Sequence, residues 1–91
     1  SRAGDGIRVA PLKICTPNPC SRKLRLVQTA PGTRTPPHAH HGREITLVLA
    51  GSYADQTGTY RQGDIVVAEG DFVHAPLAGP DGEHLSLRPA G

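Results

Sequence analysis

Three histidines and one glutamate fall within seven positions of the chain, at His38, His40, His41 and Glu44. Imidazole nitrogens and carboxylate oxygens are common ligands of divalent metal ions. Successive side chains of an extended strand point to opposite faces, so His38, His40 and Glu44 share one face while His41 points to the other. The spacing therefore predicts half of a metal site.

His74 is the candidate that completes this site. It follows the segment 63–71, which reads as a strand and a turn, and neighbouring strands lie about 4.8 Å apart. A lone strand histidine is more often a surface or hydrogen-bonded residue than a ligand. Four independent groups have no reason to share parity and spacing, whereas a metal needs them to converge. We therefore predict that a metal ion binds to His38, His40, Glu44 and His74.

The residues leave the identity of the metal open. Three imidazoles and one carboxylate suit tetrahedral Zn²⁺ in a closed structural site. They equally suit Fe, Mn, Ni or Cu with added water, and an open position would allow catalysis. An enzyme would also need an acid or base, and spacing singles out none of the candidates, which are Tyr53, Tyr60, Arg34, Asp55 and His41.

The strand that begins at Glu44 predicts the lining of an interior. Thr46, Val48 and Ala50 have the parity of Glu44, so small and apolar side chains would face inward. Such a lining suits a small apolar ligand or an oxidant more than a charged metabolite.

Short strands must position these residues. Ninety-one residues with 11 glycines, nine prolines and no tryptophan or methionine allow one domain with a modest aliphatic core. No stretch of ten or more residues has an apolar stripe at helical spacing. The predicted strands are 7–12, 23–29, 38–41 continuing after Gly42 into 44–50, 52–56, 64–68, 72–75 and 84–87. We predict an all-β fold, a small barrel or two-sheet jelly roll, with His41, Arg43 and His84 exposed.

Charge and hydropathy argue against two kinds of partner. Ten Lys and Arg against eight Asp and Glu give a net charge of +2, far from the basic excess typical of nucleic-acid binding. Charged and apolar residues alternate in the segment 22–26. This alternation is typical of a half-buried strand, so the segment does not indicate a nucleic-acid-binding patch. The apolar run 45–50 is much shorter than the roughly 20 residues that cross a bilayer. We expect no nucleic-acid partner, no membrane partner and a cytoplasmic location.

Cys15 and Cys20 flank a turn-forming stretch. They could form a disulfide if the loop brings their Cα atoms to about 5.5 Å. The low cysteine content favours free thiols over a bridge. A zinc finger with His38 and His41 is excluded, because the histidine spacing is too short and the prolines at 36–37 argue against a helix.

Two motifs resemble those of the cupin superfamily. The first is Gly32-x5-His38-x-His40-x3-Glu44-x6-Gly51, which matches at every fixed position, and the second is Gly63-x10-His74, which matches in spacing. Glu69, Asp71 and Ala78 stand where the family commonly has proline, glycine and asparagine. These departures affect turn geometry and not the histidine. The resemblance implies a cupin-type β-barrel, also called a double-stranded β-helix or jelly roll.

More narrowly, residues 36–76 resemble the ChrR-type cupin, the C-terminal domain of zinc-dependent anti-sigma factors. The resemblance lies in the pattern HxHHGxExTLVLxGxxxDxxxxxxxGDI and in the ending DFVHxP. It implies zinc, a response to oxidative stress such as singlet oxygen or peroxides, and a sigma factor bound by a preceding helical domain. Nothing in the sequence corresponds to that helical domain. We therefore expect residues 1–91 to be a single cupin domain that lacks an upstream anti-sigma domain, or a stand-alone relative.

Three functions remain open at this point. The first is a metal-bound sensor that passes a change of ligation to a partner domain, and the second is a small metal-dependent dioxygenase or isomerase. The third is a metal-stabilised scaffold or storage barrel. The expected partners are a sigma factor through the missing domain, a small ligand or oxidant in the barrel, and a second copy of the chain in a homodimer.

Overall fold

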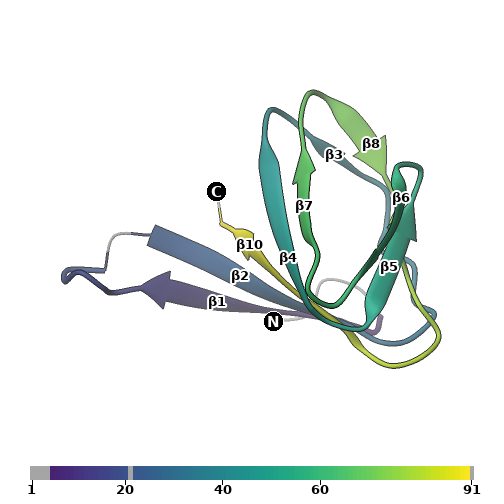
Figure 1. Cartoon of the computed structure of the whole chain (residues 1–91), viewed down its shortest axis with the longest axis horizontal. Helices are drawn as coiled ribbons and strands as arrows, with labels where there is room; N and C mark the ends of the chain where they lie inside the picture. The colour runs from purple at the N-terminus through teal and green to yellow at the C-terminus, as the bar shows by residue number, and fades with distance from the viewer. Residues whose placement is uncertain (1–4, 21, 91) are drawn as a thin grey trace.

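The computed structural model describes residues 5–20 and 22–90, and the regular structure of these residues is entirely β-strand (Figure 1). The strands are β1 (Ile7–Ile14), β2 (Arg22–Thr29), β3 (His38–His40), β4 (Glu44–Ala50), β5 (Ser52–Asp55), β6 (Gly58–Arg61), β7 (Ile65–Ala68), β8 (Phe72–His74), β9 (Leu77–Ala78) and β10 (His84–Pro89). Within the described residues, no helix is long and apolar enough to span a membrane.

Three antiparallel sheets enclose a barrel. A five-stranded sheet in the order β1-β2-β10-β4-β7 forms one wall, and a three-stranded sheet in the order β6-β5-β9 forms another. Figure 1 shows β4 and β7 facing β5 and β6, with the pair β3-β8 between them at one end. The predicted all-β barrel is confirmed.

The hairpin of β1 and β2 extends beyond the barrel (Figure 1). The two strands pair along their whole length, from Ile7 opposite Thr29 to Ile14 opposite Arg22. A disulfide joins Cys15 and Cys20 just beyond the paired strands. The prediction of free thiols is wrong, because the turn at 16–19 brings the two Cα atoms to 3.7 Å and the sulfurs meet.

The core is small and lies against the inner faces of β4 and β10. Val48 and Ser86 are opposite each other in the ladder and are both almost completely buried. The other buried apolar side chains of the described residues are Ile7, Tyr53 and Ala78. On the outer face of β7, Ile65 and Val67 are exposed. A core of this size leaves the barrel dependent on other stabilising contacts.

The expected continuous strand from residue 38 to residue 50 is interrupted. β3 ends at His40, Gly42 has a φ of 73°, and β4 begins at Glu44 in a different sheet. A φ in the left-handed region suits glycine, which has no Cβ to clash with the backbone. His40 and Glu44 are therefore joined across a turn and do not lie on one strand.

Gly51 has a structural reason to be glycine. It links β4 to β5 with a φ of 69°, and a Cβ at this position would collide with the backbone carbonyl of Glu83. The last position of the first motif thus allows the chain to pass close to the start of β10.

His84 is buried, so the prediction that it is exposed is wrong. It lies opposite Thr29 with the inward parity of Ser86, and its ring centroid is 4.9 Å from that of Tyr53. Neither ring nitrogen has a well-aligned hydrogen-bond partner. Burial lowers the pKa of His84, and the charge of Arg88 lowers it further, against a weaker opposing effect of the Ala50 backbone. The ring is therefore a neutral part of the core.

Candidate metal centre

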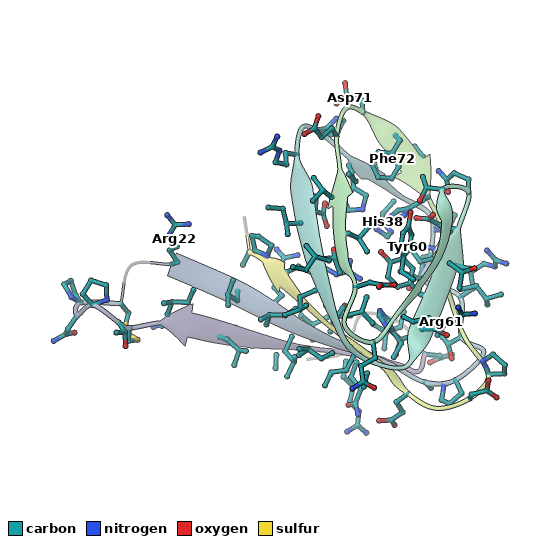
Figure 2. All side chains as sticks on the ribbon, in the orientation of Figure 1. Arg22, His38, Tyr60, Arg61, Asp71 and Phe72 are labelled. Carbon is teal, nitrogen blue, oxygen red and sulfur yellow. A yellow bond between two sulfur atoms is a disulfide. The ribbon has the colours of Figure 1, made fainter. Side chains whose placement is uncertain are left out.

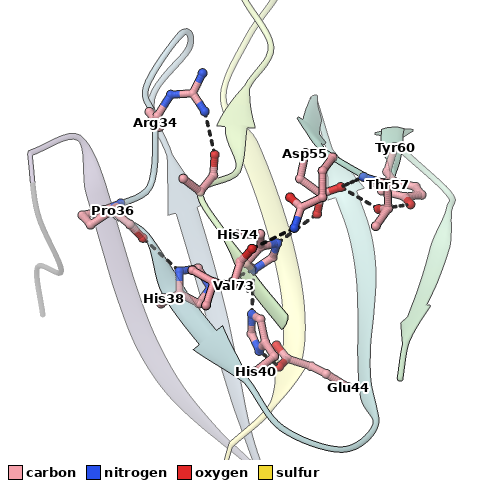
Figure 3. A network of polar contacts seen from close by, with 12 residues as sticks. Arg34, Pro36, His38, His40, Glu44, Asp55, Thr57, Tyr60, Val73 and His74 are labelled. Carbon is pink, nitrogen blue, oxygen red and sulfur yellow. Dashed lines mark hydrogen bonds and ion pairs between the residues drawn. The ribbon is translucent and has the colours of Figure 1, made fainter. Parts of the chain in front are cut away.

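Three histidine side chains converge at the end of the barrel closed by β3 and β8. His38 and His40 alternate with Ala39 along β3, and antiparallel pairing sets His38 opposite His74 on β8. The Nε2 atom of His74 lies 2.6 Å from Nε2 of His40 and 2.9 Å from Nε2 of His38 (Figure 3). The predicted meeting of these three residues is confirmed, and the three rings could hold a metal ion.

The other nitrogen of each ring has an oxygen acceptor. Nδ1 of His38 lies 3.0 Å from the Pro36 carbonyl oxygen, Nδ1 of His74 lies 2.9 Å from a carboxylate oxygen of Asp55, and Nδ1 of His40 contacts Glu44. These acceptors assign the proton of each neutral ring to Nδ1. All three Nε2 lone pairs then point into one space with no proton between them. A cation is what such an arrangement accommodates.

The dimensions of the cluster fit a divalent ion. One donor atom from each histidine lies within 4.8 Å of the others. Zn–N bonds of 2.0–2.1 Å in a tetrahedral site place two nitrogen ligands roughly 3.3 Å apart, so a slight opening of the rings would admit an ion. Burial lowers the pKa of His40 by more than Glu44 raises it, which keeps the imidazole neutral as a ligand must be.

Glu44 lies at the edge of this cluster. Its carboxylate contacts Nδ1 of His40, on the side of the ring away from the three Nε2 atoms (Figure 3). The turn at 41–43 brings Glu44 back against His40 at the start of β4. Glu44 thus orients His40 in this structure, and its direct ligation of a metal remains a prediction.

Asp55 is the functional residue whose role the spacing of residues did not reveal. It accepts a hydrogen bond from His74 Nδ1, and Thr57 donates to it from both its backbone nitrogen and its hydroxyl, at 2.8 and 2.6 Å. Burial raises the pKa of Asp55, but the bonds from Thr57 and His74 outweigh it and the net pKa shift is downward. An ionised carboxylate therefore fixes the ring of His74. The signal in the sequence was an aspartate that ends a strand two residues before a threonine.

We expect the Asp55→Asn protein to bind metal about 10–100-fold more weakly than the wild type, since a partner that orients a histidine ligand is typically worth that much. The matched control is Asp71→Asn, which alters an exposed carboxylate 3.2 Å from Nδ1 of the exposed His41. Competition with a coloured chelator measures both affinities. Equal affinities of the two variants would contradict the role assigned to Asp55.

A cavity of about 380 Å³ opens beside the histidines. Thr46 lines it, as the parity of β4 predicts, and Val48 is buried on the same face. The cavity also contains charged and phenolic groups that the predicted apolar lining did not include, namely Arg88, Tyr53 and Tyr60. Burial raises the pKa of Tyr53 to about 12, so its hydroxyl remains protonated.

The five candidate acids and bases are divided by their positions. Tyr53, Tyr60 and Asp55 line the cavity. His41 is exposed outside it, as predicted, and Arg34 donates a hydrogen bond to the Ala75 carbonyl oxygen at 2.8 Å. Figure 2 shows His38 and Tyr60 within the ring of strands, whereas Arg22 and Asp71 point away from it.

Comparisons with known proteins agree with this geometry. The family profile described as ChrR cupin-like domain matches residues 1–88. The anti-sigma-E factor ChrR of Cereibacter sphaeroides is 37% identical over 75 residues, which are 82% of this chain and 33% of that protein. The chain therefore spans a third of the length of this curated relative.

Solved structures give the same result. The crystal structure of Rhodobacter sphaeroides SigE in complex with the anti-sigma ChrR matches with a TM-score of 0.80 and 33% identity, over 97% of this chain and 46% of that one. The polyketide cyclase RemF of Streptomyces resistomycificus matches with a TM-score of 0.73 and 21% identity, over 99% and 69% of the two chains. The second likeness shows the fold alone.

Proposed function

The chain belongs to the family of ChrR cupin-like domains, and on that premise we propose that it is the metal-binding sensory module of an anti-sigma factor. The observation that carries this proposal is that the Nε2 atoms of three histidines converge. Each of the three rings is held in place by an oxygen atom that contacts its Nδ1 atom. In the proposal His38, His40 and His74 hold the ion through Nε2, and Glu44 supplies the fourth ligand once its carboxylate turns from Nδ1 of His40 toward the ion.

Zinc is the metal we propose, because three neutral imidazoles and one carboxylate suit its tetrahedral preference. A divalent ion in this position would be coordinated by the three Nε2 lone pairs and could also accept a ligand from the adjoining cavity. Asp55 and the Pro36 carbonyl hold the rings in place, and the cavity gives a small molecule access to them. A change in ligation would thereby depend on what enters the cavity.

Oxidative stress is the signal we propose. Cys15 and Cys20 are joined at the end of the β1–β2 hairpin, outside the barrel, so their thiol chemistry is separate from the histidine cluster (Figure 1). An oxidant would therefore act on the module through the metal centre or through a small molecule bound beside it. We propose a cytoplasmic location on the basis of the proposed sigma-factor partner and not of the disulfide, since the exposed Cys15–Cys20 bond would be open to reduction there.

A sigma factor is the proposed partner of the whole protein. One relative is an anti-sigma factor, and a matching structure holds such a factor together with SigE. Since this chain spans only part of each, we assign the sigma-factor contact to a region outside residues 1–91. A homodimer remains a prediction.

A small metal-dependent enzyme, of dioxygenase or isomerase type, is the alternative. The observation that favours it is the cavity of about 380 Å³ lined by Tyr53 and Arg88 beside the histidines. Such a concave site with a few polar groups is typical of substrate binding. The metal discriminates between the two functions, because Fe or Mn would favour oxygen or Lewis-acid chemistry over a closed zinc site.

The decisive experiment is elemental analysis of the purified protein and of a variant with both His38→Ala and His74→Ala. We expect about one zinc per wild-type chain and less than a tenth of that in the variant, because two of the proposed ligands are gone. One zinc that is lost in the variant supports the sensor. Iron or manganese would favour the enzyme, and a metal-free wild type after growth and refolding with zinc would overturn the metal site.

A further inference from the structure

Arg88 is a charged side chain in the cavity without a strong partner. It lies on β10 with the inward parity of Ser86 and His84, and it lines the cavity together with His40 and His74. Its Nε and Nη2 atoms are each 3.4 Å from the hydroxyl of Ser86, which is long for a hydrogen bond. No carboxylate of the described residues lies within ion-pair distance of its guanidinium.

A half-buried guanidinium without a carboxylate partner is costly. Burial lowers the pKa of Arg88, and the charges of Glu44 and Tyr53 oppose that shift at longer range. Arginine nevertheless stays protonated in proteins, so its positive charge persists in the cavity. A guanidinium can donate two parallel N–H hydrogen bonds to the two oxygens of a carboxylate. The guanidinium of Arg88 is therefore available to bind an anion that the described residues do not supply.

The charges around the cavity leave room for such an anion. Glu44 and Asp55 are negative, Arg88 is positive, and Glu69 at the rim is paired with Arg43 at 2.7 Å. A divalent ion on the histidines would turn this small negative excess into a net positive charge. A monoanion that enters the cavity would cancel that net positive charge where the low dielectric makes it most costly.

The rest of the lining describes the body of the ligand. Val66, Ala68 and Phe72 give the cavity an apolar side, and its volume of about 380 Å³ suits a small molecule. We propose that Arg88 binds the carboxylate of a small aliphatic monocarboxylate whose chain packs on this apolar side, next to the metal ion. This inference rests on the proposed metal site, whose charge it uses, and it replaces the expected neutral apolar ligand.

Tyrosine fluorescence gives a local test with butyrate as the probe. The chain has two tyrosines and no tryptophan, and both tyrosines line the cavity. We expect butyrate to change the fluorescence of the zinc-loaded protein saturably and the neutral amide butyramide to bind at least about tenfold more weakly. Arg88→Gln should weaken butyrate binding about 10–100-fold, the usual effect of losing a charge-assisted pair. Arg61→Gln, which removes an exposed arginine outside this cavity, should leave it unchanged.

The zinc content of every sample separates this inference from the proposed function. A wild type that holds one zinc but binds butyrate no better than butyramide would overturn the inference and leave the metal site standing. Equal butyrate binding by the Arg88→Gln protein would also overturn it, as would tighter binding of inorganic phosphate than of butyrate. If Arg88→Gln does not fold, the NMR signal of the Arg88 Nε–H group is followed in the wild type during titration with butyrate. A change in its chemical shift supports the contact, and an unchanged chemical shift contradicts it.

Discussion

The His40→Ala protein is expected to lose its metal, whereas the His41→Ala protein keeps one ion per chain. These neighbours differ in the face of the chain that they occupy. The side chain of His40 is 12% exposed and contacts His74, whereas that of His41 is 79% exposed and contacts Asp71. A hydrogen-bond partner that orients a histidine ligand is worth about 10–100-fold in metal affinity. Loss of the ligand itself should therefore lower the metal affinity by more than about 100-fold.

Elemental analysis after dialysis against a limiting zinc buffer measures this difference. Circular dichroism shows whether each variant keeps its strands, so that a loss of metal is not mistaken for a loss of fold. The exposed pair of His41 and Asp71 should contribute little to stability, which makes His41→Ala a clean control. Equal losses of metal in the two variants would show that the cluster of Nε2 atoms does not bind the ion.

The histidine cluster could be predicted because strand geometry is local. Parity alone places His38 and His40 on one face, and a neighbouring strand needs only the correct register to add His74. The same rule predicted that Thr46 and Val48 face inward and that His41 faces outward. These residues lie within single strands, across one strand pair or, for His41, directly after the end of β3, so that alternation is the only information required.

Predictions that depended on where a strand begins or ends were less successful. The turn at Gly42 separates His40 from Glu44, so shared parity could not describe how the two side chains meet. The last strand was predicted to end at residue 87, but β10 continues to Pro89 and carries Arg88 into the cavity. His84 is buried for a related reason, because its inward position is set by pairing with Thr29, 55 residues earlier in the chain. Such long-range pairing leaves little trace in a local pattern.

The size of the core connects the site to the stability of the barrel. The fully buried apolar residues of the described chain are few, and β3 and β8 form a sheet of only two strands. An isolated two-stranded pair is marginally stable in water. An ion held by His38 and His40 on β3 and by His74 on β8 would cross-link this pair. The Cys15–Cys20 disulfide cannot replace it, because it closes only a short loop at the end of the β1–β2 hairpin.

Removal of the metal is therefore expected to lower the melting temperature by more than about 10 °C. A ligand that binds only the folded state contributes about 4 kcal/mol when its concentration is about 1,000 times its Kd. For a domain of this size, that corresponds to a shift of roughly 15–30 °C. Differential scanning calorimetry of the zinc-loaded protein, before and after treatment with EDTA, measures the change.

The double variant with His38→Ala and His74→Ala is the matched control, since it lacks ligands on both strands of the β3–β8 pair. Its melting temperature should already be low and should not respond to EDTA, whereas the wild type should recover when zinc is restored. Such a recovery would show that EDTA does not damage the protein irreversibly. EDTA also leaves the Cys15–Cys20 bond intact, so the change in melting temperature would report on the metal. An unchanged melting curve of the wild type after complete removal of metal would mean that strand pairing alone holds β3 and β8 together. The stability of the barrel would then not depend on the metal ion of the proposed sensor site.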